Sequence, residues 1–215
     1  MTASVRRWIV AAVCLGAWGA PGVVSAQVAV SRMTSIGLAP KLDDFERAAA
    51  DYFGVSDRDV AALRARQMSD DDLPVALFIA QQADLKVDTV ADLRARHYSW
   101  WEISARYRLD AEAFYVPASG ATGPAYGRAF GYYTSRPRSQ WSTIVLGDAD
   151  IVNLVQLRFL SRFYRVSPSL VIDLREHTGD FLTVQREIEK LRAGESGPAP
   201  AAATPTGRGR GGEPR

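Results

Sequence analysis

The sequence has very few side chains that bind transition metals or form covalent bonds. It contains one cysteine, Cys14, and two histidines, His97 and His177, and it has neither an HExxH segment nor a cysteine pair. An ordinary zinc site needs several such ligands, so no metal site and no cofactor are expected. Each histidine lies near the end of a predicted helix, where it is better explained as a partner of the helix dipole.

Long apolar runs are also scarce, and the clearest one lies close to the N-terminus. Arg6 and Arg7 precede the apolar run 9–20, and Val24-Ser25-Ala26 follows it directly before Gln27. This order of charged, apolar and small residues is typical of a cleavable signal peptide. The run is too short to cross a bilayer of about 30 Å, so no transmembrane anchor is expected after cleavage. The predicted location is therefore periplasmic or secreted.

The expected mature chain has no excess charge of either sign. Without Arg6 and Arg7, 24 of the 26 basic residues remain against 24 acidic ones. A neutral chain attracts neither a phosphate backbone nor an anionic membrane over long distances, so nucleic acid is not expected as a partner. Cys14 leaves with the leader, so disulfides cannot stabilise the mature protein.

The C-terminal end lacks side chains that could form a core. From Ala193 onward no apolar side chain larger than alanine or proline occurs, which predicts disorder. The expected organisation is a signal peptide at 1–26, a linker at 27–40, a single helical domain at 41–192 and a disordered tail at 193–215.

What the sequence does contain is an internal repeat. The segment 52–64 (YFGVSDRDVAALR) reappears at 163–175 (FYRVSPSLVIDLR), and a weaker copy occupies 82–94 (QADLKVDTVADLR). Matching positions hold Val60, Val90 and Val171, and further downstream Ser69, Ser99 and Asp180. Three copies in one register predict three related structural units, at about 52–81, 82–111 and 163–192.

Each unit has the start signals of two helices. Ser56-x-x-Asp59 and Ser167-Pro168 begin the first helix of two units, and Asp88 is expected to cap it in the middle unit. Ser69-x-x-Asp72 and Ser99-x-x-Glu102 are capping boxes that begin the second helix. The fold class is therefore all-α, with three two-helix hairpins in a small bundle or a short helical array.

Two further helices are predicted outside the hairpins. One covers 42–53, and the other covers 150–164, which is apolar on most sides and is expected to be the most buried helix. Its apolar character favours a closed bundle over an open stack.

The stretch 117–142 interrupts the helical pattern with glycine and proline and is rich in aromatic residues. It is predicted to be a long, ordered, irregular loop. Aromatic and arginine side chains suit flat partners such as sugar rings or peptide side chains, although the same side chains can equally cover the helices. The candidate partner-binding residues are Trp100, Trp101, Tyr126, Arg128, Tyr132, Tyr133 and Trp141.

No catalytic set can be recognised. Glu102 beside Trp100 and Trp101 has the composition of a glycan-cleaving site, but its capping-box position already gives it a structural role, and no partner carboxylate or nucleophile is identifiable. Asp70-Asp71-Asp72 lacks the spacing of a calcium loop and is explained by the first turn of a helix. Catalysis is therefore not expected.

The aligned arginines Arg64, Arg94 and Arg175 allow two interpretations. They form either a basic stripe or structural contacts at helix ends, where cations are favoured. The structural interpretation is preferred.

Two resemblances bear on function. The spacing Tyr164-x-Val166-Ser167, followed by Val171-x-x-Leu174-Arg175, and the segment SWWEI at 99–103 resemble motifs of uncharacterised exported bacterial helical proteins, over roughly 43–192. That resemblance implies no activity. The pattern WWEIxxxYxL is also similar to the first helices of helix-turn-helix DNA-binding domains, but Pro117 would cut the recognition helix short.

These observations favour a non-catalytic binding or scaffold protein of the cell envelope, with an unidentified protein or cell-wall partner. The first alternative is a cell-wall glycan-binding or glycan-cleaving protein. The second alternative is a helix-turn-helix nucleic-acid-binding protein.

Overall fold

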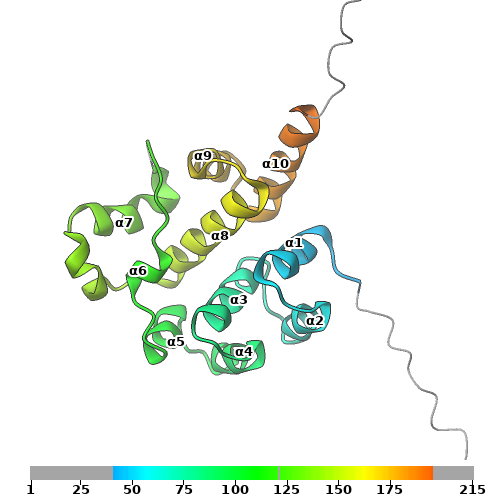
Figure 1. Ribbon diagram of the computed structural model, residues 1–215, viewed down its shortest axis with the longest axis horizontal. Coiled ribbons are helices and arrows are strands. Elements are labelled where there is room, and N and C mark those ends of the chain that lie inside the picture. Colours follow the sequence, from blue (N-terminus) through cyan, green and yellow to red (C-terminus); the bar gives the residue numbers. More distant parts are fainter. Residues whose placement is uncertain (1–40, 121, 196–215) are drawn as a thin grey trace, which may run out of the picture. The chain divides into compact units, whose positions relative to one another are not determined.

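The computed structural model describes residues 41–120 and 122–195, all of which belong to one compact unit. Within these ranges every regular element is helical and no strand is present, which confirms the all-α prediction (Figure 1). The elements are α1 (Asp44–Phe53), α2 (Asp57–Ala65), α3 (Leu73–Gln82), α4 (Val87–Ala95), α5 (Trp100–Arg106), α6 (Ala111–Phe114), α7 (Gly123–Thr134), the 3₁₀ helix η1 (Arg138–Thr143), α8 (Asp148–Tyr164), α9 (Pro168–Thr178) and α10 (Phe181–Glu195).

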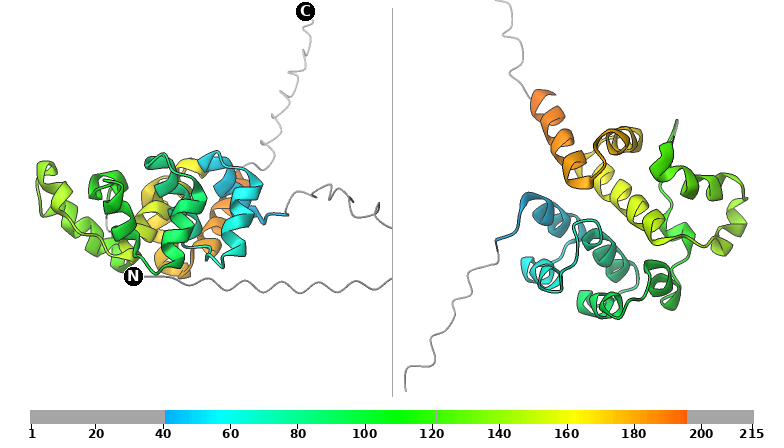
Figure 2. Two further views of the ribbon diagram at one scale, coloured as in Figure 1. Left: turned by 90° about the horizontal axis from the view of Figure 1, so that it is seen from below. Right: turned by 180° about the vertical axis from the view of Figure 1, so that it is seen from behind.

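The three repeats form the predicted hairpins α2–α3, α4–α5 and α9–α10. The matching valines Val60, Val90 and Val171 are all fully buried, so the repeats turn the same side inward. Contacts between α2 and α4 and between α3 and α4 join the first two hairpins. Figure 2 shows their helices, coloured cyan to green, standing side by side.

Most of the predicted caps are present. Ser56 and Ser99 form complete capping boxes with Asp59 and Glu102, and Ser167 accepts a hydrogen bond from the amide of Leu170. The prediction for the middle unit was wrong, because α4 begins after Lys86 without a side-chain cap. Asp88 instead forms an ion pair with Arg66, the C-cap residue of α2.

Six connections between helices share one geometry: a residue with positive φ, then an apolar residue, then a residue that in five of the six is the N-cap of the next helix. They are Gly54-Val55-Ser56, Gln67-Met68-Ser69, Asp84-Leu85-Lys86, His97-Tyr98-Ser99, Arg108-Leu109-Asp110 and Arg165-Val166-Ser167. In the exception, Ser69 accepts from the amide of Asp72, but the N-cap of α3 is Asp72 itself, so the predicted capping box at Ser69 was wrong. In each connection the amide of the apolar residue donates to the carbonyl five residues earlier, as in a Schellman motif. The same turn thus joins six pairs of consecutive helices.

Helix α8 is the centre of the domain. It contacts α1, α3, α5, α6, α7, α9 and α10, so helices from both halves of the chain close around it. Leu154, Leu157, Phe159 and Leu160 of α8 are fully buried, as its apolar sequence requires. The expectation that this helix is the most buried one was nevertheless wrong, because α3 is buried over a larger share of its length, from Leu73 to Ala80, where it packs between α4 and α8.

The stretch 117–142 differs from the predicted irregular loop, because it contains α7 and continues into η1. Its glycines suggest a loop because glycine disfavours helices. The buried side chains Tyr126, Ala129, Phe130 and Tyr133 nevertheless recur at helical spacing, and they pack α7 on α8 and α9. Tertiary packing therefore overrides the low local propensity.

The ends of the chain are only partly covered. The predicted signal peptide 1–26 and linker 27–40 lie outside the described residues, as does most of the predicted tail. Helix α10 continues to Glu195 and so includes the first residues assigned to that tail. None of the helices in the described ranges is long and apolar enough to cross a membrane.

Candidate functional site

A cleft of about 340 Å³ lies where α7 meets η1 and the segment that follows α6. It is lined by Tyr115, Ala118, Gly120, Thr122, Gly127, Phe130, Gly131, Tyr133, Thr134 and Trp141. Four of these residues are aromatic and three are glycines. We call this site the aromatic cleft.

Three aromatic rings form one wall of the aromatic cleft. The ring centroids of Tyr115 and Tyr133 lie 4.5 Å and 4.9 Å, respectively, from that of Trp141, and 5.0 Å from each other. The Tyr133 hydroxyl donates to the carbonyl of Ala111 at 2.7 Å, and the indole Nε1 of Trp141 donates to the carbonyls of Tyr133 and Arg136. These bonds use the polar atoms of the rings for support, so the rings present apolar surface to the cleft.

Two glycines of α7 form a part of the lining that has no side chains. Gly127 and Gly131 are four residues apart and therefore share one face of the helix. A Cβ atom built on either residue would meet no other atom within 4 Å. The space beside these glycines is thus open, and a ligand can approach the backbone of α7 closely.

Arg158 of α8 braces the segment that carries Tyr115. Its Nη2 donates to the carbonyls of Ala113 and Tyr115, each at 2.8 Å, and its guanidinium lies 5.0 Å from the centroid of the Phe78 ring. Burial lowers the pKa of Arg158, and the nearby charge of Arg162 acts in the same direction. Arg158 therefore positions the end of α6 without contacting the cleft itself.

Asp150 fixes α7 to the start of α8. Its carboxylate, only 3% exposed, accepts from Nε of Arg128 at 2.9 Å and from the amide of Gly147 at 2.9 Å. The amide nitrogen of Asn153 donates to the Ala125 carbonyl at 2.7 Å. These contacts hold α7 against the start of α8, and Arg128 thereby has a structural partner.

Of the seven candidate partner-binding residues, only Tyr133 and Trp141 line the aromatic cleft. Tyr126 is fully buried, Tyr132 is half-buried beside the Arg136 guanidinium, and Arg128 pairs with Asp150. The structure thus brings together two residues of the predicted set and separates the others from the cleft.

Trp100 is a core residue. It is fully buried, its indole Nε1 donates to Asp72 at 2.7 Å, its backbone amide donates to Asp148 at 2.7 Å, and the Arg94 guanidinium lies 4.5 Å from its ring centroid. Trp101 beside it is half-buried and packs against the core. Neither ring forms an open aromatic platform.

Glu102 is part of a helix cap, and the hydrogen bonds of that cap stabilise its ionised form. Its carboxylate accepts hydrogen bonds from the amide and the hydroxyl of Ser99, and these bonds lower its pKa. A general acid needs a raised pKa to hold its proton near neutral pH. The environment of Glu102 therefore does not suit a glycan-cleaving acid.

The aligned arginines Arg64 and Arg94 have structural roles. Arg64 forms ion pairs with Glu46 and Asp70 and donates to the Met68 carbonyl at 2.9 Å. Arg94 pairs with Asp148 at 2.7 Å and donates to the Tyr98 carbonyl at 3.1 Å. Both side chains close the turn of their hairpin, as the structural interpretation predicted. Arg175 differs from them and is considered below.

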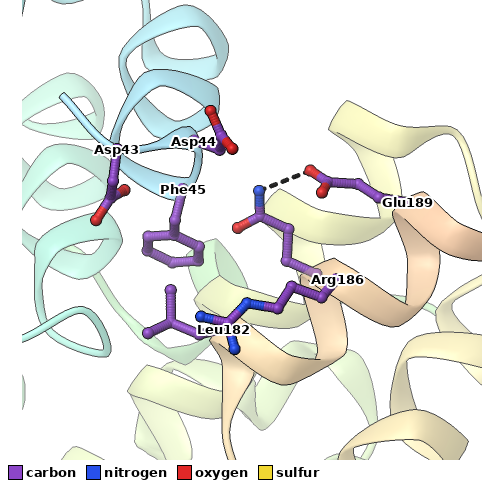
Figure 3. Close-up of a pocket in the computed structure, with 7 residues that line it drawn as sticks. Asp43, Asp44, Phe45, Leu182, Arg186 and Glu189 are labelled. Carbon is purple, nitrogen blue, oxygen red and sulfur yellow. Dashed lines mark hydrogen bonds between the residues drawn. The ribbon is translucent and has the colours of Figure 1, made fainter.

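One other hollow in the described part of the chain is less suited to a ligand. A notch of about 170 Å³ between the start of α1 and α10 is lined by Asp43, Asp44, Phe45, Leu182, Gln185, Arg186 and Glu189 (Figure 3). There Gln185 donates to Glu189 at 2.8 Å, so polar groups at the notch already pair with each other. Among the described residues no group of three or more histidine, cysteine, aspartate or glutamate side chains is placed to hold a metal ion.

The sequence-based candidates omitted Tyr115, Gly127 and Gly131. Tyr115 stands outside the aromatic-rich stretch and reaches the cleft only through the position of α6. The four-residue spacing of the two glycines was visible in the sequence, but it has structural meaning only once the segment is recognised as a helix. No family model, curated protein or solved structure matches this chain.

Proposed function

We propose that this protein is an exported, non-catalytic binding module of the cell envelope and that it holds its partner in the aromatic cleft. The observation that carries the proposal is the combination of an aromatic wall and two glycines around a volume of about 340 Å³. Export is inferred from the leader pattern at 1–26, in which charged, apolar and small residues follow one another.

The lining of the cleft indicates the kind of ligand. All of its lining residues are uncharged, and its polar side chains besides tyrosine and tryptophan are Thr122 and Thr134. Rigid aromatic rings favour a flat, weakly polar group such as the face of a sugar ring or an apolar peptide side chain. A protein segment is the primary candidate, and a cell-wall glycan is the alternative.

The same lining supports binding without catalysis. It contains no carboxylate, imidazole or thiol that could transfer a proton or attack a bond. The helix-turn-helix alternative gains no support either, because α6, in the place of a recognition helix, is only 4 residues long.

Filling the cleft tests the proposal without weakening the fold. A leucine in place of Gly131 has room for its Cβ and improves helix propensity, so Gly131→Leu is expected to fold at least as well as the wild type. Gly131→Ala makes the same backbone change but adds only a methyl group, and it serves as the matched control. We expect about a tenfold loss of partner binding in Gly131→Leu and little loss in Gly131→Ala.

Binding is measured by placing a photoreactive residue at Thr134, on the edge of the cleft, or at Arg58, which is exposed on α2. A cross-link to an envelope protein that forms at Thr134, is absent at Arg58 and disappears in Gly131→Leu supports the protein-partner proposal. Retention on purified peptidoglycan that is lost in Gly131→Leu identifies the glycan alternative instead. Cross-linking and retention that are both unaffected by Gly131→Leu would exclude the cleft as the binding site.

A further inference from the structure

Arg175 is the exception among the three aligned arginines. Arg64 and Arg94 pair with carboxylates of other segments and donate to the carbonyl four residues later. Arg175 stacks on Phe181, with its guanidinium 4.6 Å from the ring centroid, but it makes no ion pair or hydrogen bond to any described residue. The repeat therefore keeps the cation at this position and leaves out its carboxylate partner.

A second polar group without a partner lies near this arginine. The hydroxyl of Tyr126 is buried, as is Nε of Arg175, and neither atom has a hydrogen-bond partner among the described residues. Tyr126 is 0% exposed, and burial raises the pKa of its phenol while the charge of Arg175 acts to lower it. Buried polar atoms nearly always have hydrogen-bond partners. The donor capacity of Arg175 is therefore not used up by contacts within the described residues.

A cavity of about 440 Å³ lies beside Arg175, between the start of α7 and the end of α9. It is lined by Pro124, Ala125, Arg175, Glu176, His177 and Gly179. His177 adds positive character, because its hydrogen bond with the Asp173 carbonyl raises its pKa. The Arg175 guanidinium is thus available to a molecule that enters the cavity.

Neighbouring carboxylates limit the charge of that molecule. Glu176 lies against Gly123 at the start of α7, where its carboxylate occupies the place that a Cβ would take. Asp71 and Asp180 act on Arg175 through space, although both line a different hollow. Repulsion from these groups disfavours a doubly charged anion such as phosphate and favours a singly charged carboxylate.

We propose that this cavity binds the carboxylate group of a ligand, which accepts hydrogen bonds from the guanidinium of Arg175. Charge-assisted bonds from arginine to a carboxylate are among the strongest hydrogen bonds in proteins. The inference does not depend on the aromatic cleft, since the two sites share no lining residue. The carboxylate belongs either to a small free acid or to the C-terminus of a peptide.

The experiment is a titration of the ¹⁵N-labelled mature chain, with backbone amide shifts of Ala125 and Gly179 as the readout. Sodium acetate probes for a small acid, acetyl-Ala-Ala probes for a peptide C-terminus, and sodium chloride at equal ionic strength is the reference. We expect saturable shifts with at least one carboxylate. Tighter binding of acetyl-Ala-Ala than of acetate identifies a peptide terminus, and equal affinities identify a small acid.

Three variants show which side chains bind the carboxylate. Arg175→Met keeps an apolar chain over Phe181 and is expected to weaken carboxylate binding by about tenfold or more, while His177→Gln removes the positive character of a second lining side chain and is expected to weaken binding about threefold at pH 6. Arg94→Met is the matched control from the equivalent repeat position, and it should lower stability but leave carboxylate affinity unchanged.

The proposal fails if neither carboxylate shifts the two amides beyond the effect of chloride. It also fails if a folded Arg175→Met binds as tightly as the wild type. If Arg175→Met does not fold, as circular dichroism would reveal, His177→Gln becomes the deciding variant, because His177 is exposed and its substitution should leave the fold intact.

Discussion

Single arginine side chains tie segments of this protein together through backbone carbonyls as much as through carboxylates. Arg158 holds the end of α6 by two carbonyls, and Arg64 and Arg94 each bind the carbonyl that ends their hairpin turn. A guanidinium has five donors in a fixed fork, so it can close a turn and reach a second helix at once. At Arg175 the guanidinium has no such partner among the described residues, and in our proposal it donates its hydrogen bonds to the carboxylate of a ligand.

Glu102 provides a test of the capping interactions at the residue scale. The hydrogen bonds from Ser99 lower the folded-state pKa of Glu102, so its ionised form stabilises the fold. This contribution is present above the ordinary glutamate pKa and is lost as the pH falls through the lowered folded-state value. Glu102→Gln is therefore expected to be less stable than the wild type at pH 7, and the difference should shrink toward pH 3. Urea unfolding at a series of pH values measures it.

A second substitution serves as the control for that measurement. In a Ser99→Ala background the hydroxyl donor is absent, so Glu102→Gln should change stability less than it does in the wild type. A stability difference between Glu102→Gln and the wild type that is independent of pH would contradict the assignment.

At the scale of elements, the domain is assembled from one turn used repeatedly. Every copy places a residue at positive φ, which is strained unless that residue is glycine. Only the turn at Gly54 uses glycine among the six, while Gln67 has a φ of 59° and His97 a φ of 65°. Most of these turns therefore form despite a local conformational cost, because the apolar residue and the cap that follow are favourable.

Glycine at the strained positions should stabilise the protein. Gln67 and His97 are exposed, and neither side chain has a hydrogen bond with another described residue, so Gln67→Gly and His97→Gly remove strain at little other loss. We expect each to raise the free energy of unfolding by about 0.5–1 kcal/mol. Chemical denaturation monitored by circular dichroism measures the change.

The reverse substitution is the control. Gly54 has a φ of 66°, and Gly54→Ala should lower the free energy of unfolding by about 1 kcal/mol. If the glycine variants of Gln67 and His97 are also destabilised, the turns are not strained and the interpretation is wrong.

At the scale of the whole molecule, closure around α8 determines which surfaces remain available. Helices of all three hairpins contact α8, and so does α7. This arrangement buries Trp100 and Tyr126 and leaves hollows on both sides of α7: the aromatic cleft toward η1 and the carboxylate cavity toward α9. Both proposed sites therefore depend on the position of one helix.

Export is a property of the whole chain and is tested on it directly. When the full sequence is expressed in a bacterium with two membranes, we expect a periplasmic product whose mass corresponds to a chain that begins at Gln27. A bulky residue in place of Ala26 should block cleavage and leave the leader attached. Recovery of a chain that begins at Met1 in the cytoplasmic fraction would refute the proposed location.

The local signals of the sequence predicted the helical hairpins because those signals act within a few residues. Ser56, Ser99 and Ser167 cap the helices that follow them, and Val60, Val90 and Val171 are buried. The stretch 117–142 was harder to predict, since its glycines oppose the helix that its aromatic residues stabilise through contacts with α8 and α9.

What the sequence by itself determined is thus the class of the fold and the repeated hairpin, both of which follow from side-chain periodicity and caps along one segment. Only the tertiary structure decided which aromatic residues are available and which arginine lacks a partner. Tyr115 and Trp141 meet at a cleft, while Trp100 is buried and Arg175 has no ion-pair partner among the described residues. Such differences depend on segments far apart in the chain, and no local pattern encodes the distance between them.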